Sequence, residues 1–119
     1  GDPGVKRWFE PFPAVVLFLC TLVIGEVRRG VERLRKRDPV QAQVYQVWLE
    51  MLRNDYSDRL LPVTVAVAEE WGRLNVPDPI PVVDGLMAAT ARVHDLTLVT
   101  RNTGDLIRTG ISLLNPFSK

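Results

Sequence analysis

The chain has 119 residues, of which 46% are hydrophobic and 24% are charged, and its formal net charge is +1. This composition is typical of a folded protein and excludes a disordered chain. The length predicts a single domain, residues 1–119, with one core. A net charge near zero neither requires nor excludes a nucleic-acid partner. The single cysteine, Cys20, excludes an internal disulfide and fits a reducing cytoplasm, where we expect a buried structural thiol.

The apolar run at residues 14–25, AVVLFLCTLVIG, raises the question of a membrane segment. It is too short, because a transmembrane helix needs about 20 apolar residues. Glu10 and two prolines precede the run, whereas a signal peptide carries basic residues there. We therefore expect no membrane association, and a buried parallel strand that runs into a helix.

Strand and helix patterns alternate along the chain. The tail of a helix is expected at residues 3–10, and further helices at 22–36, 39–54, 65–74 and 82–94, with a helical turn at 105–109. Strands are expected at 16–20, 60–63, 97–100 and 112–114. The proline-rich segment 75–81 excludes regular structure. This alternation predicts a parallel α/β sandwich with right-handed crossovers.

Two helices carry apolar residues at helical spacing. In the helix at 22–36 these are Val23, Val27, Val31 and Leu34. The next helix begins at Asp38-Pro39, an N-cap followed by proline at the first helical position. On it we expect one buried stripe, formed by Val40, Val44, Val47, Trp48 and Met51.

Three acidic side chains follow predicted strands. Glu26 lies just past the first strand, Asp84 lies in the first turn of the helix at 82–94, and Asp105 follows the strand at 97–100. Parallel sheets collect functional groups at the carboxyl ends of their strands. Clustered carboxylates repel one another unless a cation is bound, so these acids indicate a divalent-metal site acting on phosphate. Taken singly, each acid is more often a helix cap or a solvated surface group.

Three segments resemble a known family. VIGEVRRGVERLRKRDP, VVDGLMAATARVHDLTLVTRNTGDL and the ending ISLLNPF are similar to PIN-domain ribonucleases of the VapC toxin type. The similarity runs in order from about Asp2 to Phe117, and its most specific part is the set of a helix Glu, an Asp before AATA, and TRN followed by an Asp. It implies a PIN-like three-layer sandwich with a small parallel sheet. In that family four acidic positions bind Mg²⁺ or Mn²⁺, and Glu26, Asp84 and Asp105 match three of them.

The resemblance also implies an activity and partners. The protein would be a cytoplasmic, metal-dependent endoribonuclease toxin that hydrolyses RNA phosphodiesters, restrained by a VapB-type antitoxin and forming a homodimer. Thr100 and Asn102 would hydrogen-bond a ligand carboxylate, a water or the phosphate. Arg28, Arg29 and Arg101 are candidate phosphate contacts.

The chain departs from the family at its start. Family members begin with a strand that ends in Asp and lies at the centre of the sheet order 3-2-1-4-5; here that strand is missing, and Asp2 does not replace it. The flanking strands could pair directly, another chain could supply a strand, or the sequence is a partial copy. An alternative function is therefore an impaired PIN remnant that serves only as an antitoxin-binding or dimerisation module. Its docking residues would be Trp8, Phe9, Val44, Trp48 and Met51, for which core packing is the more common role.

Overall fold

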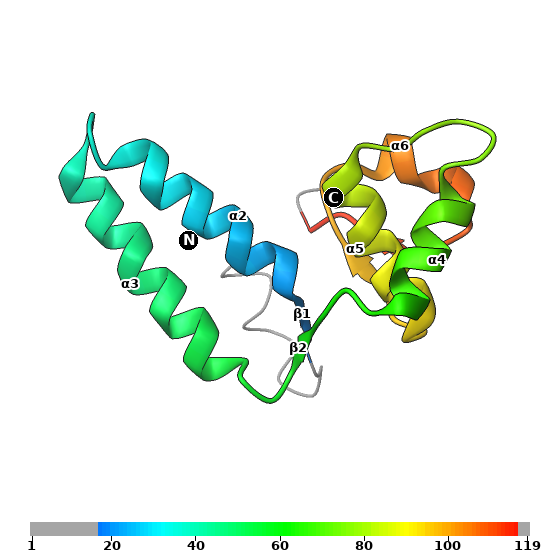
Figure 1. Cartoon of the computed structure of the whole chain (residues 1–119), viewed down its shortest axis with the longest axis horizontal. Coiled ribbons are helices and arrows are strands. Elements are labelled where there is room, and N and C mark those ends of the chain that lie inside the picture. The colour runs from blue at the N-terminus through cyan, green and yellow to red at the C-terminus, as the bar shows by residue number, and fades with distance from the viewer. Residues whose placement is uncertain (1–16, 117–119) are drawn as a thin grey trace. The chain divides into compact units, whose positions relative to one another are not determined.

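The computed structural model describes residues 17–116 (Figure 1). The predicted helix at 3–10, which includes Trp8 and Phe9, lies outside these residues. Asp2, which was not expected to be a site residue, lies outside them as well. The chain divides into two compact units. One runs from Leu17 to Pro62 and is called the hairpin unit; the other, called the C-terminal unit, is described over residues 63–116.

The hairpin unit consists of two antiparallel helices between two short strands. Its elements are β1 (Leu19–Cys20), α2 (Thr21–Leu34), α3 (Pro39–Asp55) and β2 (Leu60–Leu61). The strands pair in parallel, with Leu19 opposite Leu60 and Cys20 opposite Leu61. Helix α3 begins where the sequence predicts, because the Asp38 side chain accepts a hydrogen bond from the Gln41 amide at 3.1 Å.

The core of the hairpin unit lies between α2 and α3. Its buried apolar side chains are Val27, Val31, Ala42 and Leu49. Val27 and Val31 confirm the stripe that was predicted on the first of these helices, and Val23 and Leu34 are half-buried there.

The stripe predicted to be buried on α3 is wrong. Val40, Val44, Val47 and Met51 are exposed, and Trp48 is half-buried. At about 100° per residue, these four exposed residues point about 180° away from Ala42 and Leu49, which face α2. Helix α3 therefore has two apolar sides, and hydrophobic spacing alone selected the longer apolar row rather than the side that meets its neighbour.

The C-terminal unit packs two longer helices with a second pair of strands. Its elements are α4 (Val65–Leu74), α5 (Val82–Val93), β3 (Leu98–Val99), α6 (Thr103–Leu106), the 3-10 helix η1 (Ile107–Thr109) and β4 (Leu113–Leu114). Strands β3 and β4 are parallel, with Leu98 opposite Leu113 and Val99 opposite Leu114. Thr64 caps α4 by accepting a hydrogen bond from the Val67 amide at 3.2 Å.

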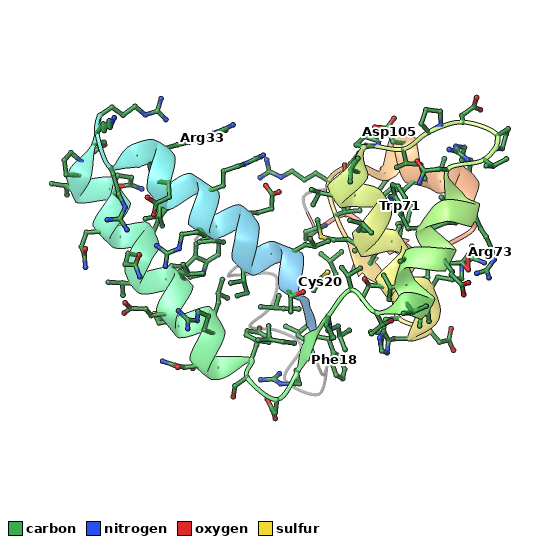
Figure 2. The ribbon with its side chains drawn as sticks, in the orientation of Figure 1. Phe18, Cys20, Arg33, Trp71, Arg73 and Asp105 are labelled. Carbon is green, nitrogen blue, oxygen red and sulfur yellow. The ribbon has the colours of Figure 1, made fainter. Side chains whose placement is uncertain are left out.

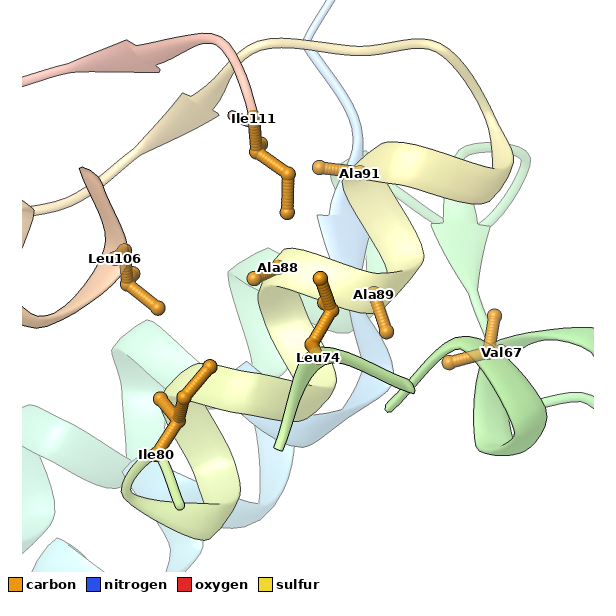
Figure 3. Close-up of a cluster of buried hydrophobic side chains, with 8 residues drawn as sticks. All are labelled: Val67, Leu74, Ile80, Ala88, Ala89, Ala91, Leu106 and Ile111. Carbon is orange, nitrogen blue, oxygen red and sulfur yellow. The ribbon is translucent and has the colours of Figure 1, made fainter. Parts of the chain in front are cut away.

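The core of this unit is built on one face of α5 (Figure 3). Its buried residues come from α4, α5, α6 and the segments before α5 and before β4, and they are Val67, Leu74, Ile80, Ala88, Ala89, Ala91, Leu106 and Ile111. The three alanines let the neighbouring segments approach α5 closely, because a methyl group takes little room.

All predicted helices and strands in the described residues are present. The strands are shorter than predicted, and each unit contains one parallel pair of them, so the predicted α/β fold with small parallel sheets is confirmed. Which of the three outcomes expected for the flanking strands applies stays a prediction.

The expectation of buried strands is wrong in part. Phe18 is exposed, and Cys20 is half-buried where a buried thiol was expected. Thr97 is exposed, and Leu98 and Val99 are half-buried. Each described strand pairs on one side only, which leaves these side chains less covered than in the middle of a wide sheet. No helix within residues 17–116 combines the length and the apolar character that a membrane crossing requires.

Candidate active site

Asp84 and Asn102 are in direct contact. The Asn102 side-chain amide Nδ2 donates a hydrogen bond to Asp84 Oδ2 at 2.7 Å, and both side chains are half-buried. Asp84 lies in the first turn of α5, where unpaired backbone amides favour a negative charge. The hydrogen bond occupies one oxygen of the carboxylate, so that Oδ1 is the oxygen left to contact a ligand.

The turn after β3 fixes Asn102 in place. Thr100 Oγ1 accepts a hydrogen bond from the Asn102 backbone amide at 3.1 Å. The Thr100 amide in turn donates to the Leu114 carbonyl at 3.0 Å, which ties this turn to β4. Asn102 is the N-cap residue of α6. The polar turn predicted from TRN is therefore held by the sheet, and its amide side chain faces the start of α5.

Asp105 lies in the first turn of α6 and is exposed (Figure 2). Its neighbour Leu106 is fully buried in the core, and α6 contacts α5. Leu106 therefore anchors the short helix while the carboxylate beside it stays in solvent. The C-terminal unit thus carries Asp84, Thr100, Asn102 and Asp105 on the first turn of α5 and on the segment that runs from β3 into α6.

Asn75 holds the loop that leads into α5, and the sequence reading did not identify this role. Its Nδ2 donates to the Trp71 carbonyl at 2.7 Å, and its Oδ1 accepts from the Ile80 amide at 3.0 Å. Ile80 is buried just before α5 begins at Val82. An Asn at the end of a helix, before a proline-rich loop, is the signal that could have indicated this clamp.

Gly85 lets α4 and α5 approach each other, a second feature that was not predicted. A Cβ at Gly85 would lie 3.1 Å from Trp71 Cδ1 and 3.2 Å from Trp71 Nε1. The indole nitrogen is buried without a hydrogen-bond partner in the described structure. Because Gly85 has no side chain, the indole ring of Trp71 can pack directly against the first turn of α5, next to Asp84.

The third predicted acid and two predicted arginines lie on α2 in the hairpin unit. Glu26 Oε2 accepts a hydrogen bond from Arg29 Nη2 at 3.1 Å. Arg28 donates to Gln46 Oε1 at 2.9 Å and to Glu32 at 3.4 Å. Both arginines therefore have partners on the hairpin.

Convergence of Glu26 with the other two acids stays a prediction. Within either unit, residues 17–116 contain no group of three His, Cys, Asp or Glu side chains placed to hold a metal. Arg101, predicted to contact phosphate, is exposed on the turn that carries Thr100 and Asn102.

The donor atoms of Asp84, Asn102 and Asp105 are of the type that a hard divalent cation prefers. Asp84 Oδ1, the Asp105 carboxylate and the Asn102 side-chain oxygen are all oxygen ligands, which Mg²⁺ and Mn²⁺ prefer. The residues present therefore suit such an ion without a nitrogen or sulfur ligand.

Comparison with known proteins identifies the family of this chain. The chain is 26% identical to the toxin FitB of Neisseria gonorrhoeae over 95% of its own length and 84% of that protein. It is 24% identical to the VapC ribonuclease Y4jK of Sinorhizobium fredii, over 98% of the chain and 86% of the relative. A solved structure of FitAB bound to an IR36 DNA fragment has the same fold, with a TM-score of 0.81, 24% identity, and coverage of 99% of this chain and 85% of that one. The PIN domain model matches residues 4–111, and the chain therefore belongs to the PIN-domain family.

Proposed function

We propose that this protein is a divalent-metal-dependent endoribonuclease that acts as the toxin of a toxin–antitoxin pair. The observation that carries the proposal is the hydrogen bond between Asn102 and Asp84, which occupies Oδ2 of the carboxylate and leaves Oδ1 for a ligand. Membership of the PIN-domain family and the similarity to a VapC ribonuclease and to the toxin FitB support it.

In this proposal Asp84 and Asp105 hold Mg²⁺ or Mn²⁺, and Glu26 is the third acidic ligand. The bound ion would polarise the phosphodiester and lower the pKa of the attacking water. Asn102 positions Asp84, because its amide satisfies Oδ2 and keeps the carboxylate from rotating. Thr100 fixes the backbone of the same turn.

The substrate and partners follow from the same family. RNA is the proposed substrate, with Arg101, Arg28 and Arg29 as contacts to its phosphates, since guanidinium groups bind phosphate through two parallel hydrogen bonds. The proposed regulator is a VapB-type antitoxin in the cytoplasm, and the proposed assembly is a homodimer. The FitAB structure bound to DNA supports a partner protein for this fold.

The test is an RNA cleavage assay with and without Mg²⁺ or Mn²⁺, run on the wild type and on Asp84→Asn. Asp95→Asn is the matched control, because Asp95 is an exposed acid that follows the same helix and has φ of 55°, where Asn is well tolerated. We expect Asp84→Asn to abolish metal-dependent cleavage and Asp95→Asn to retain it. Cleavage by Asp84→Asn at the wild-type rate would refute the assignment.

Metal binding is measured independently of activity. Mn²⁺ broadens the NMR signals of nearby amides, so titration of the wild type should broaden the signals of Asp84, Asn102 and Asp105 before others. A parallel sample carries an added upstream strand ending in Asp, because the family resemblance implies a fourth acidic ligand. Mn²⁺ broadening spread evenly over the chain would argue against a site on this turn.

The second candidate is a PIN domain that binds a partner without cutting RNA. It is favoured by one observation, namely that the described C-terminal unit holds two of the predicted ligands but no group of three. A folded wild-type chain that neither cuts RNA nor binds Mn²⁺, with or without the added strand, would support this function and exclude the nuclease.

A further inference from the structure

The C-terminal half of α2 and the turn after it carry a line of arginines on one side. Arg29, Arg33 and Arg37, here called the basic row, follow one another at intervals of four residues. The Asp38 amide donates to the Leu34 carbonyl at 2.8 Å, so the helical pattern of hydrogen bonds continues past the end of α2. Residues four apart lie on the same side of a helix, and the basic row is therefore straight.

The basic row lies away from the core of the hairpin unit. At about 100° per residue, its centre is about 140° around the axis from Val27 and Val31, the buried residues of α2. All three arginines are exposed. Figure 2 shows Arg33 on the side of α2 that faces away from α3. The basic row is consequently open to a ligand from solvent.

The basic row begins beside Glu26, the acid proposed as the third metal ligand. Glu26 lies about one turn before Arg29, and its Oε2 accepts a hydrogen bond from Arg29 Nη2 at 3.1 Å. Along the helix axis, Arg33 is about 10 Å and Arg37 about 16 Å beyond Glu26, at 1.5 Å per residue. The cations thus lead from the proposed ion toward the far end of α2.

The basic row also contains charge that the protein itself does not use. Arg28 and Arg35, on another side of α2, both form ion pairs with Glu32, at 3.4 and 3.1 Å. Arg33 and Arg37, by contrast, form no ion pair with any residue between 17 and 116. Like charges four residues apart on a helix repel each other. An anion bound along the row would remove this repulsion.

One strand of RNA has the matching chemistry. Each of its phosphates carries a negative charge, and successive phosphates lie at a distance similar to the rise of about 6 Å between neighbours in the basic row. A guanidinium group binds a phosphate through two parallel hydrogen bonds. Continuity with Glu26 favours RNA over an acidic peptide, because a strand that reaches the proposed ion presents its next phosphates to the row.

We propose that the basic row binds the RNA phosphates next to the point of cleavage and sets the path of the substrate along α2. This assignment rests on the proposed function, which has RNA as the substrate and Glu26 as a metal ligand. Arg33 and Arg37 are the new contacts, and they position the strand without touching the reacting phosphate. Their loss should therefore raise KM for RNA more than it lowers kcat.

The first test is binding of a fluorescein-labelled single-stranded RNA of about 12 nucleotides, a typical length for single-strand sites. Fluorescence anisotropy is recorded in EDTA, so the result does not depend on metal-dependent cleavage. Each phosphate contact on a single strand contributes about 0.7 to the slope of log K against log salt concentration. Arg33→Gln/Arg37→Gln should therefore reduce this slope by about 1.4 and weaken binding about 25-fold at about 0.1 M salt.

The matched control is Arg53→Gln/Arg73→Gln, which removes the same charge from exposed arginines on α3 and α4. We expect this pair to bind RNA nearly as tightly as the wild type. Arg33→Lys/Arg37→Lys keeps both charges and should keep the salt slope. A wild type that does not bind RNA, or equal weakening by both glutamine pairs, would overturn the proposal.

A cleavage assay in Mn²⁺ separates this inference from the nuclease proposal. A wild type that binds RNA through the basic row but does not cut it would contradict the nuclease alone. A wild type that cuts RNA, with KM unchanged in Arg33→Gln/Arg37→Gln, would contradict the basic row alone.

Two other roles of the basic row predict different results for Arg33→Gln/Arg37→Gln. Polyglutamate is used as an acidic-peptide probe in the same anisotropy assay, by competition with labelled RNA. Weaker binding of polyglutamate with unchanged binding of RNA would assign the row to an acidic protein and overturn the proposal. Lower stability in urea with unchanged RNA affinity would show that these cations only stabilise the end of α2, and would overturn it as well.

Discussion

Replacement of Leu49 and Met51 by alanine, two residues apart on α3, should have very different effects on stability. Leu49 is 1% exposed and packs between α2 and α3, whereas Met51 is 53% exposed on the opposite side of α3. Leu49→Ala removes three carbons, which costs about 2.4 kcal/mol in transfer free energy at about 0.8 kcal/mol for each. The cavity left behind raises the expected loss to about 3–5 kcal/mol.

Met51→Ala should change the free energy of unfolding by less than about 1 kcal/mol. About half of the side chain is already in water, and alanine has the highest helix propensity. The difference of at least 2 kcal/mol corresponds to roughly 1–2 M in the urea midpoint at a slope of about 1–2 kcal/mol/M.

The assay is urea unfolding followed by circular dichroism, at a low protein concentration that keeps the chain monomeric. A loss for Met51→Ala at low concentration as large as that for Leu49→Ala would refute the assignment of the inner and outer sides of α3.

Three further predictions concern local contacts. Asn102→Ala removes the 2.7 Å hydrogen bond to Asp84, so Mn²⁺ affinity measured by NMR titration should fall several-fold while the free energy of unfolding drops by about 1–2 kcal/mol; unchanged affinity would argue against the positioning role. Asp38→Ala removes the cap of α3 and should cost about 1 kcal/mol in urea unfolding, whereas Asp38→Asn, which keeps a capping oxygen, should cost much less. Gly85→Val would force its side chain into the indole ring, because Trp71 Cδ1 lies only 3.1 Å from the position of a Cβ at Gly85. The free energy of unfolding should fall by about 2–3 kcal/mol in urea unfolding. A stability equal to that of the wild type would show that the indole ring can move aside.

The order and type of the described elements were predictable because their signals are local. Asp38-Pro39 marked the start of α3, the proline-rich segment marked the loop before α5, and alternating strands and helices indicated a parallel α/β arrangement. The family resemblance added the PIN assignment, which the match over residues 4–111 confirms.

The features that the sequence did not predict are contacts between segments that lie apart along the chain. On α3 the longer row of apolar residues is exposed, and the buried side is formed by Ala42 and Leu49. The clamp made by Asn75 depends on the path of a loop, and the space next to Gly85 depends on the packing of Trp71. Spacing within one helix carries no information about either. Asn102 contacts Asp84, while the roles of Glu26, Asp84 and Asp105 and the single-domain organisation stay predictions.

The two parallel strand pairs differ in how much chain must be ordered before they can form. A complete helical hairpin separates β1 from β2, whereas only α6 and η1 separate β3 from β4. Closure of a shorter loop loses less entropy, and contacts between residues close in sequence form faster. We therefore expect β3 and β4 to associate early during folding, together with the turn that places Asn102 beside Asp84. The pairing of β1 with β2 should follow only after α2 and α3 have packed together.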